Sequence, residues 1–178
     1  DQLAARLGCE PGDREILADA ALLHDVGYHI SYERHHKHSY HLILHADLLG
    51  VTPQEQVAIA NVARYHRGKP PKKTHENFGR LDRALRRRVS RLSALLRVAD
   101  GLDRGHVSAV ESVAVACDRR RVRIAATAVP EVGPLRLELW GASRKSQLLA
   151  ELLDAELEFV APDGSVVGPG DGADDEGE

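Results

Sequence analysis

The 178-residue sequence contains no methionine and only two cysteines, Cys9 and Cys117. Two distant cysteines are too few for a disulfide framework or a cysteine-rich zinc site, so we expect both thiols to be reduced. No stretch approaches the roughly 18 consecutive apolar residues of a membrane helix, and no basic segment followed by an apolar one opens the chain. The sequence therefore favours a cytoplasmic protein that is neither secreted nor inserted into a membrane.

The absence of an initiator methionine indicates that this chain is a piece of a longer protein, although removal of an initiator would also account for it. The first residues, "DQLAARLG", are typical of the end of an amphipathic helix rather than of its beginning. We therefore expect a first domain, over residues 1–106, whose N-terminal part is truncated.

Positive charge is concentrated in one part of an otherwise acidic chain. The net charge is −3, but residues 64–104 contain thirteen Lys and Arg against four Asp and Glu, so this segment carries +9 and the remainder −12. Such a distribution predicts an anionic partner bound at one place rather than general affinity for nucleic acid. The run "RALRRRVSR", residues 83–91, is interpreted instead as the solvated face of a helix.

Apolar residues recur at helical spacing in four segments of the first domain, residues 13–27, 33–49, 52–66 and 89–99. The third has the strongest start, because Thr52 is a suitable N-cap, Pro53 takes the first helical position and Glu55 completes a capping box. Residues 67–79 contain paired prolines, several lysines and no apolar period, which predicts a basic loop.

Beyond residue 106 the pattern changes to one typical of strands. The predicted strands are "VESVAVAC", "RVRIAATAV", "LRLELW" and "ELEFV", with "DRR" as the turn between the first two and a short helix over residues 143–154. These elements predict a small α+β domain over residues 107–162. The acidic remainder, residues 163–178, has little to bury and is predicted to be a disordered tail.

Polar residues end several of the predicted apolar helix faces. His24 and Asp25 end the first, His66 ends the third and Asp100 lies near the end of the fourth. A polar side chain there costs free energy unless it has a partner, and imidazole and carboxylate groups are ligands of water-activating divalent metals. We therefore predict that these four residues converge on a metal pocket. Taken singly, a histidine on an apolar face is more often a hydrogen-bonded core residue than a ligand, and Asp100 alone could be a helix-end residue paired with Arg97 or Arg104.

Four motifs follow one another along the chain, "ALLHDVG", "HHKHSY", "IANVARYHRGKPPKK" and "LLRVADGLDR". In this order they resemble the HD-type C-terminal half of the Ppx/GppA family of exopolyphosphatases and guanosine pentaphosphate phosphohydrolases. The resemblance covers most of the chain. It implies a mainly α fold, in which an HD-type helical domain is followed by a small α+β unit that contains a βαβ element.

The resemblance also implies a ligand set. His24, Asp25 and Asp100 match the HD metal ligands, and His66 with one of His35 or His36 matches the additional histidines of the binuclear HD subgroup. The expected cofactor is a divalent metal, Mg, Mn, Fe or Zn, in this site, and Mg for the full-length enzyme.

Two departures from the family pattern limit what carries over. HD domains usually begin their ligand set with an earlier histidine, and no histidine precedes His24. The family's hydrolysis takes place in an actin-like domain with Gly-rich phosphate loops, which this chain lacks. We therefore assign no catalytic residue.

The leading hypothesis is an HD region that binds inorganic polyphosphate or pppGpp beside a missing catalytic domain. A polyphosphate chain offers negative charge without bases to read, which suits cationic side chains and not specific nucleic-acid recognition. The candidate cations are Lys37, Arg67, Lys69, Lys72, Lys73 and Arg104. The alternatives are a self-sufficient metal-dependent HD phosphohydrolase acting on a nucleotide or cyclic dinucleotide, and a dimerisation scaffold with a remnant pocket. We expect a homodimer.

Overall fold

The computed structural model describes residues 1–130 and 133–171, and the chain divides into two compact units. The first unit comprises Asp1 and residues 8–96, and the second comprises residues 2–7 and the chain from Arg97 onward. The sequence predicts a boundary at residue 106, whereas the units divide inside the long helix α6 (Arg83–Leu102).

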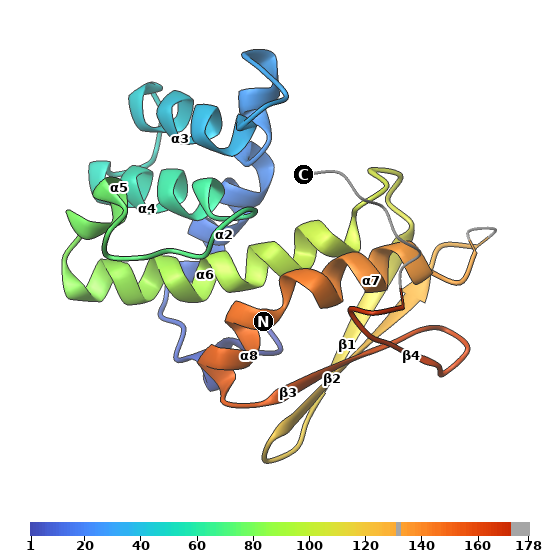
Figure 1. The fold of residues 1–178 in the computed structure, drawn as a ribbon. Coiled ribbons are helices and arrows are strands. Elements are labelled where there is room, and N and C mark those ends of the chain that lie inside the picture. Colours follow the sequence, from blue (N-terminus) through green and yellow to red (C-terminus); the bar gives the residue numbers. More distant parts are fainter. Residues whose placement is uncertain (131–132, 172–178) are drawn as a thin grey trace. The chain divides into compact units, whose positions relative to one another are not determined.

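The first unit is built from helices (Figure 1). Its elements are α2 (Asp13–Leu23), the 3₁₀ helix η1 (Val26–His29), α3 (His35–His45), α4 (Pro53–Arg64), α5 (Glu76–Gly79) and the first part of α6. Helix α4 packs against both α2 and α3, and α3 packs against η1. Fully buried Ile16, Ile43, Ile59 and Leu92 lie in the core that these helices share.

Helix α4 begins where the sequence predicts. The Thr52 side chain accepts a hydrogen bond from the Glu55 amide, and the Glu55 carboxylate accepts one from the Thr52 amide at 2.9 Å.

The predicted loop over residues 67–79 is not entirely loop, because α5 forms one helical turn at its end. Phe78 is the reason, since its ring is buried in the helical core.

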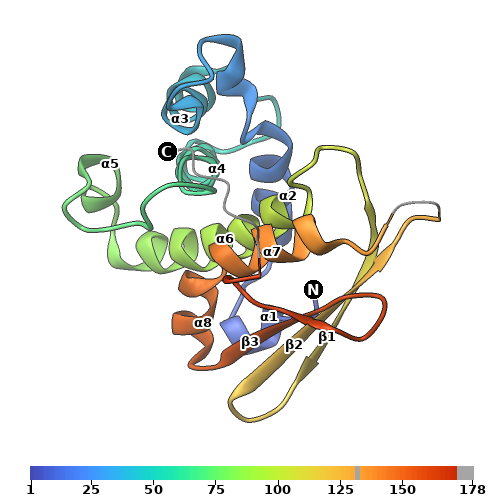
Figure 2. The same ribbon diagram turned by 45° about the vertical axis from the view of Figure 1, so that its right-hand side comes forward.

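The second unit contains a four-stranded sheet (Figure 2). Its elements are α1 (Ala4–Leu7), β1 (Val110–Cys117), β2 (Arg121–Ala128), α7 (Arg136–Lys145), α8 (Gln147–Leu153), β3 (Glu156–Val160) and β4 (Val166–Val167). The order is β1-β2-β3-β4, with β2 and β3 parallel and the other two pairs antiparallel. Helices α7 and α8 connect the parallel strands, so this unit contains the βαβ element that the family resemblance implies.

The segment "LRLELW" is helical and not a strand, so this prediction is wrong. As a strand it would place Leu135, Leu137 and Leu139 on one face. In the structure Leu137 is 51% exposed, while Leu135, Leu139 and Ala142 are buried at the spacing of a helix. Six residues satisfy both periods, and only the residues after Trp140, which continue the helical pattern, separate them.

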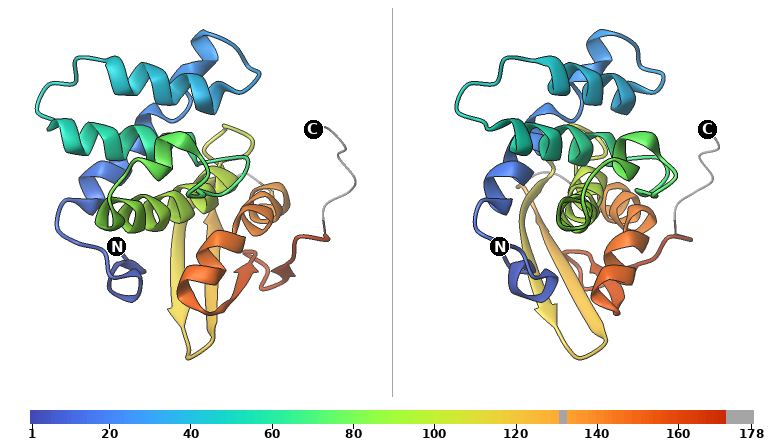
Figure 3. Two further views of the ribbon diagram at one scale, coloured as in Figure 1. Left: turned by 60° about the vertical axis from the view of Figure 1, so that its left-hand side comes forward. Right: turned by 90° about the vertical axis from the view of Figure 1, so that its left-hand side faces the viewer.

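The edge of β1 is covered by side chains from the start of the chain. The side-chain amide of Gln2 donates through Nε2 to the Val113 carbonyl at 2.7 Å and accepts at Oε1 from the Val115 backbone amide at 2.7 Å. The β1–β2 hairpin whose edge is protected in this way is visible from two further directions in Figure 3. Side-chain pairing of this kind leaves fewer backbone groups open to another strand.

The predicted tail over residues 163–178 includes β4, which pairs with β3, and residues 172–178 lie outside the described part. Among the residues that the structure describes, no helix is both long enough and apolar enough to cross a membrane.

Candidate metal centre

Four residues from three separated segments of the first unit come together. His24 caps the C-terminal end of α2, Asp25 follows it, His35 begins α3 and His66 follows α4. The Oδ1 atom of Asp25 lies 3.2 Å from Nε2 of His35 and 3.6 Å from Nε2 of His66, and its Oδ2 lies 3.2 Å from Nε2 of His24. The Nε2 atoms of His35 and His66 are 3.3 Å apart.

Each of the three histidines makes the same kind of contact with a backbone carbonyl. The Nδ1 atoms of His24, His35 and His66 each lie 2.6–3.0 Å from the carbonyl oxygen of the residue three positions earlier. A carbonyl oxygen can only accept a hydrogen bond, so each Nδ1 carries a proton and each ring directs Nε2 at the cluster, where the neutral ring offers a lone pair. For His24 and His66 this contact also satisfies a carbonyl at a helix end.

When each ring carries only its Nδ1 proton, this arrangement brings acceptor atoms together. The Oδ1 atom of Asp25 is buried and accepts no hydrogen bond from the described residues. Facing lone pairs at these distances repel each other, so the cluster is favourable only with a cation, either an added proton or a metal ion, between them.

The spacing fits a metal ion. Metal–nitrogen bonds of about 2.0–2.1 Å at tetrahedral angles separate ligand atoms by about 3.3 Å. The separations of Asp25, His35 and His66 are 3.2, 3.3 and 3.6 Å. The carbonyls bound to Nδ1 fix the ring orientations, as outer contacts of metal-ligating histidines commonly do. The residues present therefore fit a divalent cation.

The electrostatics of the cluster favour an ionised Asp25. Burial raises the pKa of its carboxyl, but a protonated His24 ring that donates a hydrogen bond, and positive charge on His24, His66 and His35, outweigh burial and hold the pKa below its ordinary value. Asp25 thus supplies the charged ligand, and a metal ion in the cluster would replace the protons on Nε2 of the nearly fully buried His35 and His66.

His36 borders the cluster. Its ring centroid lies 6.0 Å from that of His35 and 6.4 Å from that of His66, and its buried Nδ1 has no hydrogen-bond partner among the described residues. Burial, followed by the charges of Arg67 and Arg64, lowers the pKa of His36 to about 4. The ring is therefore a neutral neighbour of the cluster.

The predicted anion-binding residues of this unit are exposed. Arg67 is closest to the cluster, with its guanidinium nitrogen 3.5 Å from Nδ1 of His35. The remaining cations are the side chains of Lys37 on α3 and of Lys69, Lys72 and Lys73 in the loop after α4. Burial lowers the pKa of His75 in this loop, and Arg64, Lys72, Lys69 and Lys37 lower it further. Two histidines on different segments, His36 and His75, thus share Arg64 and Lys37 as cationic neighbours.

Two predicted residues belong to the second unit. The Asp100 carboxylate forms an ion pair with Lys145 of α7. Burial lowers the pKa of the half-buried Arg97, and the nearby Asp100 offsets part of this effect. The guanidinium of Arg104 lies over the Trp140 ring, 4.8 Å from its centroid. The metal-ligand role of Asp100 and the anion-binding role of Arg104 stay predictions of the sequence.

Sequence reasoning did not identify three residues that matter here. Ser39 is fully buried beside the loop that carries His24 and Asp25, Arg64 adds to the cationic group, and Lys145 pairs with Asp100. Only Arg64 has a signal in the sequence, as one member of the basic segment. The other two act through partners 15 and 45 positions away.

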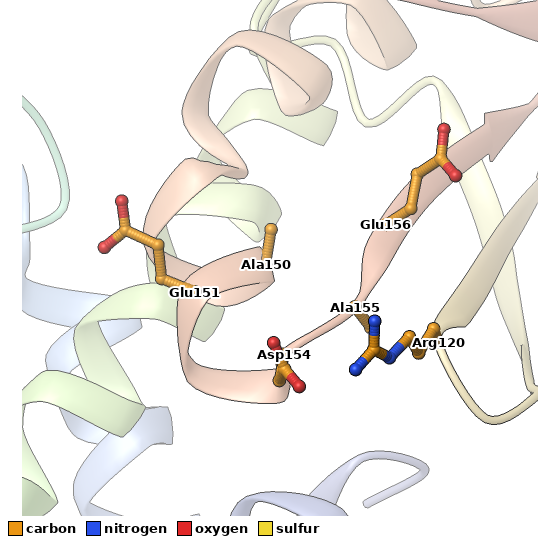
Figure 4. A pocket seen from close by; sticks show the side chains of 6 residues that line it. All are labelled: Arg120, Ala150, Glu151, Asp154, Ala155 and Glu156. Carbon is orange, nitrogen blue, oxygen red and sulfur yellow. The ribbon is translucent and has the colours of Figure 1, made fainter.

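The second unit also has a shallow pocket of about 490 Å³ (Figure 4). Its lining is Arg120, Ala150, Glu151, Asp154, Ala155 and Glu156. None of these is a predicted site residue, and the three carboxylates make the pocket a poor match for an anionic substrate.

Similarities to known proteins include the following two. The sequence model described as Ppx/GppA phosphatase, domain III, matches residues 5–129. A guanosine-5'-triphosphate,3'-diphosphate pyrophosphatase of Pseudoalteromonas atlantica is 31% identical over 86 residues, which are 47% of this chain. The matched segment covers 17% of the length of that relative.

Proposed function

Because the chain belongs to the Ppx/GppA phosphatase family, we propose that it is the part of an exopolyphosphatase-like phosphohydrolase that binds the anionic substrate. The substrate class is inorganic polyphosphate or pppGpp, and hydrolysis takes place in an actin-like domain elsewhere in the protein. The HD-type character of the first unit, which the motifs around His24 and Asp25 suggest, is part of the proposal.

The observation that carries this proposal is the cationic group around His36 and His75. Arg64 and Lys37 act on both rings, Arg67 acts on His36, and Lys69 and Lys72 act on His75. A polyphosphate chain would be held by several charge-assisted hydrogen bonds along its length. Arg67 would bind nearest the histidine cluster, since it already lies beside His35.

A divalent cation in the candidate metal centre belongs to the same proposal. His24, Asp25, His35 and His66 would hold it, and its chemistry would be the polarisation of a phosphoryl oxygen and the activation of water. The protein's own contribution is to fix the imidazole tautomers through the three backbone carbonyls. The ion would also add positive charge beside Arg67, which strengthens the attraction for a polyanion.

A second candidate function is supported by the convergence of three Nε2 atoms on one ionised carboxylate. This arrangement favours metal-dependent phosphohydrolysis by the first unit itself, on a nucleotide or cyclic dinucleotide. The two candidates differ in what the isolated chain does. An anion-binding region binds polyphosphate and releases little phosphate from it, whereas a self-sufficient hydrolase releases phosphate from a nucleotide in a metal-dependent reaction.

The test uses the purified chain in metal-free buffer, with Zn²⁺, Mn²⁺ or Mg²⁺ added back. Bound metal is measured by mass spectrometry, binding by anisotropy of labelled long-chain polyphosphate, and phosphate release by a colorimetric assay. We expect one tightly bound metal ion, polyphosphate binding and little phosphate release. Metal-dependent hydrolysis of a nucleotide that Asp25→Asn abolishes would favour the second function, and absence of polyphosphate binding would overturn the first.

Two surface histidines need a control. His41 and His45 are exposed one turn apart on α3, with ring centroids 6.4 Å apart, so they can chelate a transition metal without any buried site. The metal measurements are therefore repeated with His41→Asn and His45→Asn combined. Light scattering of the same samples gives the molar mass and so tests the expected homodimer.

A further inference from the structure

We propose that Ser39 is the positioning residue of the candidate metal centre, because it fastens the loop that carries His24 and Asp25 to the helix that begins at His35. The proposal rests on the metal-binding part of the proposed function. It concerns the contact that fixes the distance between the two segments carrying the ligand atoms.

The first observation is that the Ser39 hydroxyl is fully engaged. Its Oγ donates to the His24 carbonyl at 2.5 Å and accepts from the Gly27 amide at 2.9 Å, and Ser39 is 0% exposed. A hydroxyl has one proton to donate, and here it goes to the backbone of a metal-ligand candidate. One side chain thus binds the loop on both sides of Asp25.

The second observation is how closely η1, which follows Asp25, approaches α3. A Cβ atom on Gly27 would lie 2.2 Å from the His35 carbonyl oxygen and 2.5 Å from the Ser39 amide nitrogen. Only glycine allows this contact. The backbone on one side of the cluster therefore touches the backbone that begins α3, and the hydroxyl holds the two in register.

These contacts determine the ligand spacing. His24 and Asp25 lie on the loop, His35 lies on the first turn of α3, and Ser39 is one turn further along the same helix. The 3.2 Å separation between Asp25 and His35 depends on that junction, because the two residues share no regular secondary structure. Loss of the hydroxyl would leave the Gly27 amide and the His24 carbonyl without their partner in a buried position.

The chain contains a matched control. Ser93 in the first-unit part of α6 is also 0% exposed, and its Oγ has no hydrogen-bond partner among the described residues. Ser39→Ala and Ser93→Ala therefore remove the same atom from equally buried places. Only the first removes hydrogen bonds that hold the loop.

The test measures Co²⁺ affinity from its visible absorption, in the background that lacks the His41 and His45 imidazoles. We expect Ser39→Ala to weaken Co²⁺ binding roughly 10- to 100-fold, the usual effect of losing an outer contact of a metal ligand. Ser93→Ala should bind Co²⁺ as the parent does, and Ser39→Thr, which keeps the hydroxyl, should recover most of the affinity.

A second readout does not depend on metal. Hydrogen exchange of the Gly27 amide in the metal-free protein should accelerate in Ser39→Ala and stay slow in Ser93→Ala. Unchanged Co²⁺ affinity in Ser39→Ala, with the Gly27 amide still protected, would overturn the positioning role while leaving the metal site intact. Absence of Co²⁺ binding by the parent protein would overturn the metal site and this role with it.

Discussion

The Nε2 atoms of His35 and His66 lie 3.3 Å apart, although 31 positions separate the two residues in the chain. Both rings are almost fully buried, and both donate their Nδ1 proton to a backbone carbonyl. The two nitrogens therefore face each other as acceptors. This relationship is the core of the metal-site proposal, and it leads to the first prediction.

Divalent metal should stabilise the wild-type chain and not the ligand variants. At a free concentration of one hundred times Kd, a bound ion adds about 2.7 kcal/mol to the free energy of unfolding. We expect His66→Gln and Asp25→Asn to lose this increment, because each removes a ligand atom from the cluster. Thermal melts with and without Zn²⁺ measure it. His41→Gln, an exposed residue of α3, is the control and should keep most of the increment.

Polyphosphate binding should weaken with salt, and the weakening should depend on the loop after α4. Replacing both Lys72 and Lys73 with Ala should lower the slope of log affinity against log salt by roughly one to two, by analogy with nucleic acid. Replacing Arg83 and Arg87, which are both exposed on α6, should change it much less. Equal effects of the two pairs would mean that summed charge, and not a local site, attracts the polyanion.

Asp13 should contribute strongly to the stability of the first unit. Its carboxylate is 2% exposed, is ion-paired with Arg88 and accepts a hydrogen bond from the Glu10 amide at 2.8 Å. Asp13→Ala leaves the partly buried guanidinium without its partner, so we expect a loss of about 3 kcal/mol in urea unfolding.

The control for Asp13 is an exposed ion pair. Glu76 and Arg80 are paired across one turn of helix and are both 77% exposed, so Glu76→Gln should cost less than about 1 kcal/mol. A similar loss of unfolding free energy in both variants would show that the buried pair stabilises the unit no more than the exposed one.

Gly101 should be intolerant of any side chain. A Cβ atom there would lie 2.5 Å from the Cα atom of Ala142 of α7, at a close backbone approach inside the second unit. Gly101→Ala is expected to cost about 1–3 kcal/mol through overpacking, measured by chemical denaturation. Gly170→Ala introduces the same methyl group into open space and should be nearly neutral.

Where the free energy is local, the sequence was sufficient. Thr52, Pro53 and Glu55 specify the start of α4 within four residues, and the capping box is present as predicted. The strand "ELEFV" and the turn between β1 and β2 also follow the prediction, because alternation and turn residues act over short distances. The family was likewise recognisable from four ordered motifs, and the match over residues 5–129 confirms it.

Where the free energy comes from partners distant in the sequence, the prediction failed or stayed open. "LRLELW" fits two periods equally well, and burial of Leu139 and Ala142 selects the helix. The run over residues 83–91 is solvated at Arg83 and Arg87 but not at Arg88, which pairs with the buried Asp13. Neither the burial of Leu139 and Ala142 nor the pairing of Arg88 with Asp13 can be inferred from the local sequence pattern.

The sequence by itself determined which residue types end the apolar helix faces, and therefore that His24, Asp25 and His66 are candidates for one site. Only the tertiary structure decided that His35 joins them while His36 borders the cluster, because a rotation of about 100° per residue separates neighbours on a helix. It also decided the tautomers and the role of Ser39. These depend on carbonyl and amide positions that exist only after packing brings α3 against the loop.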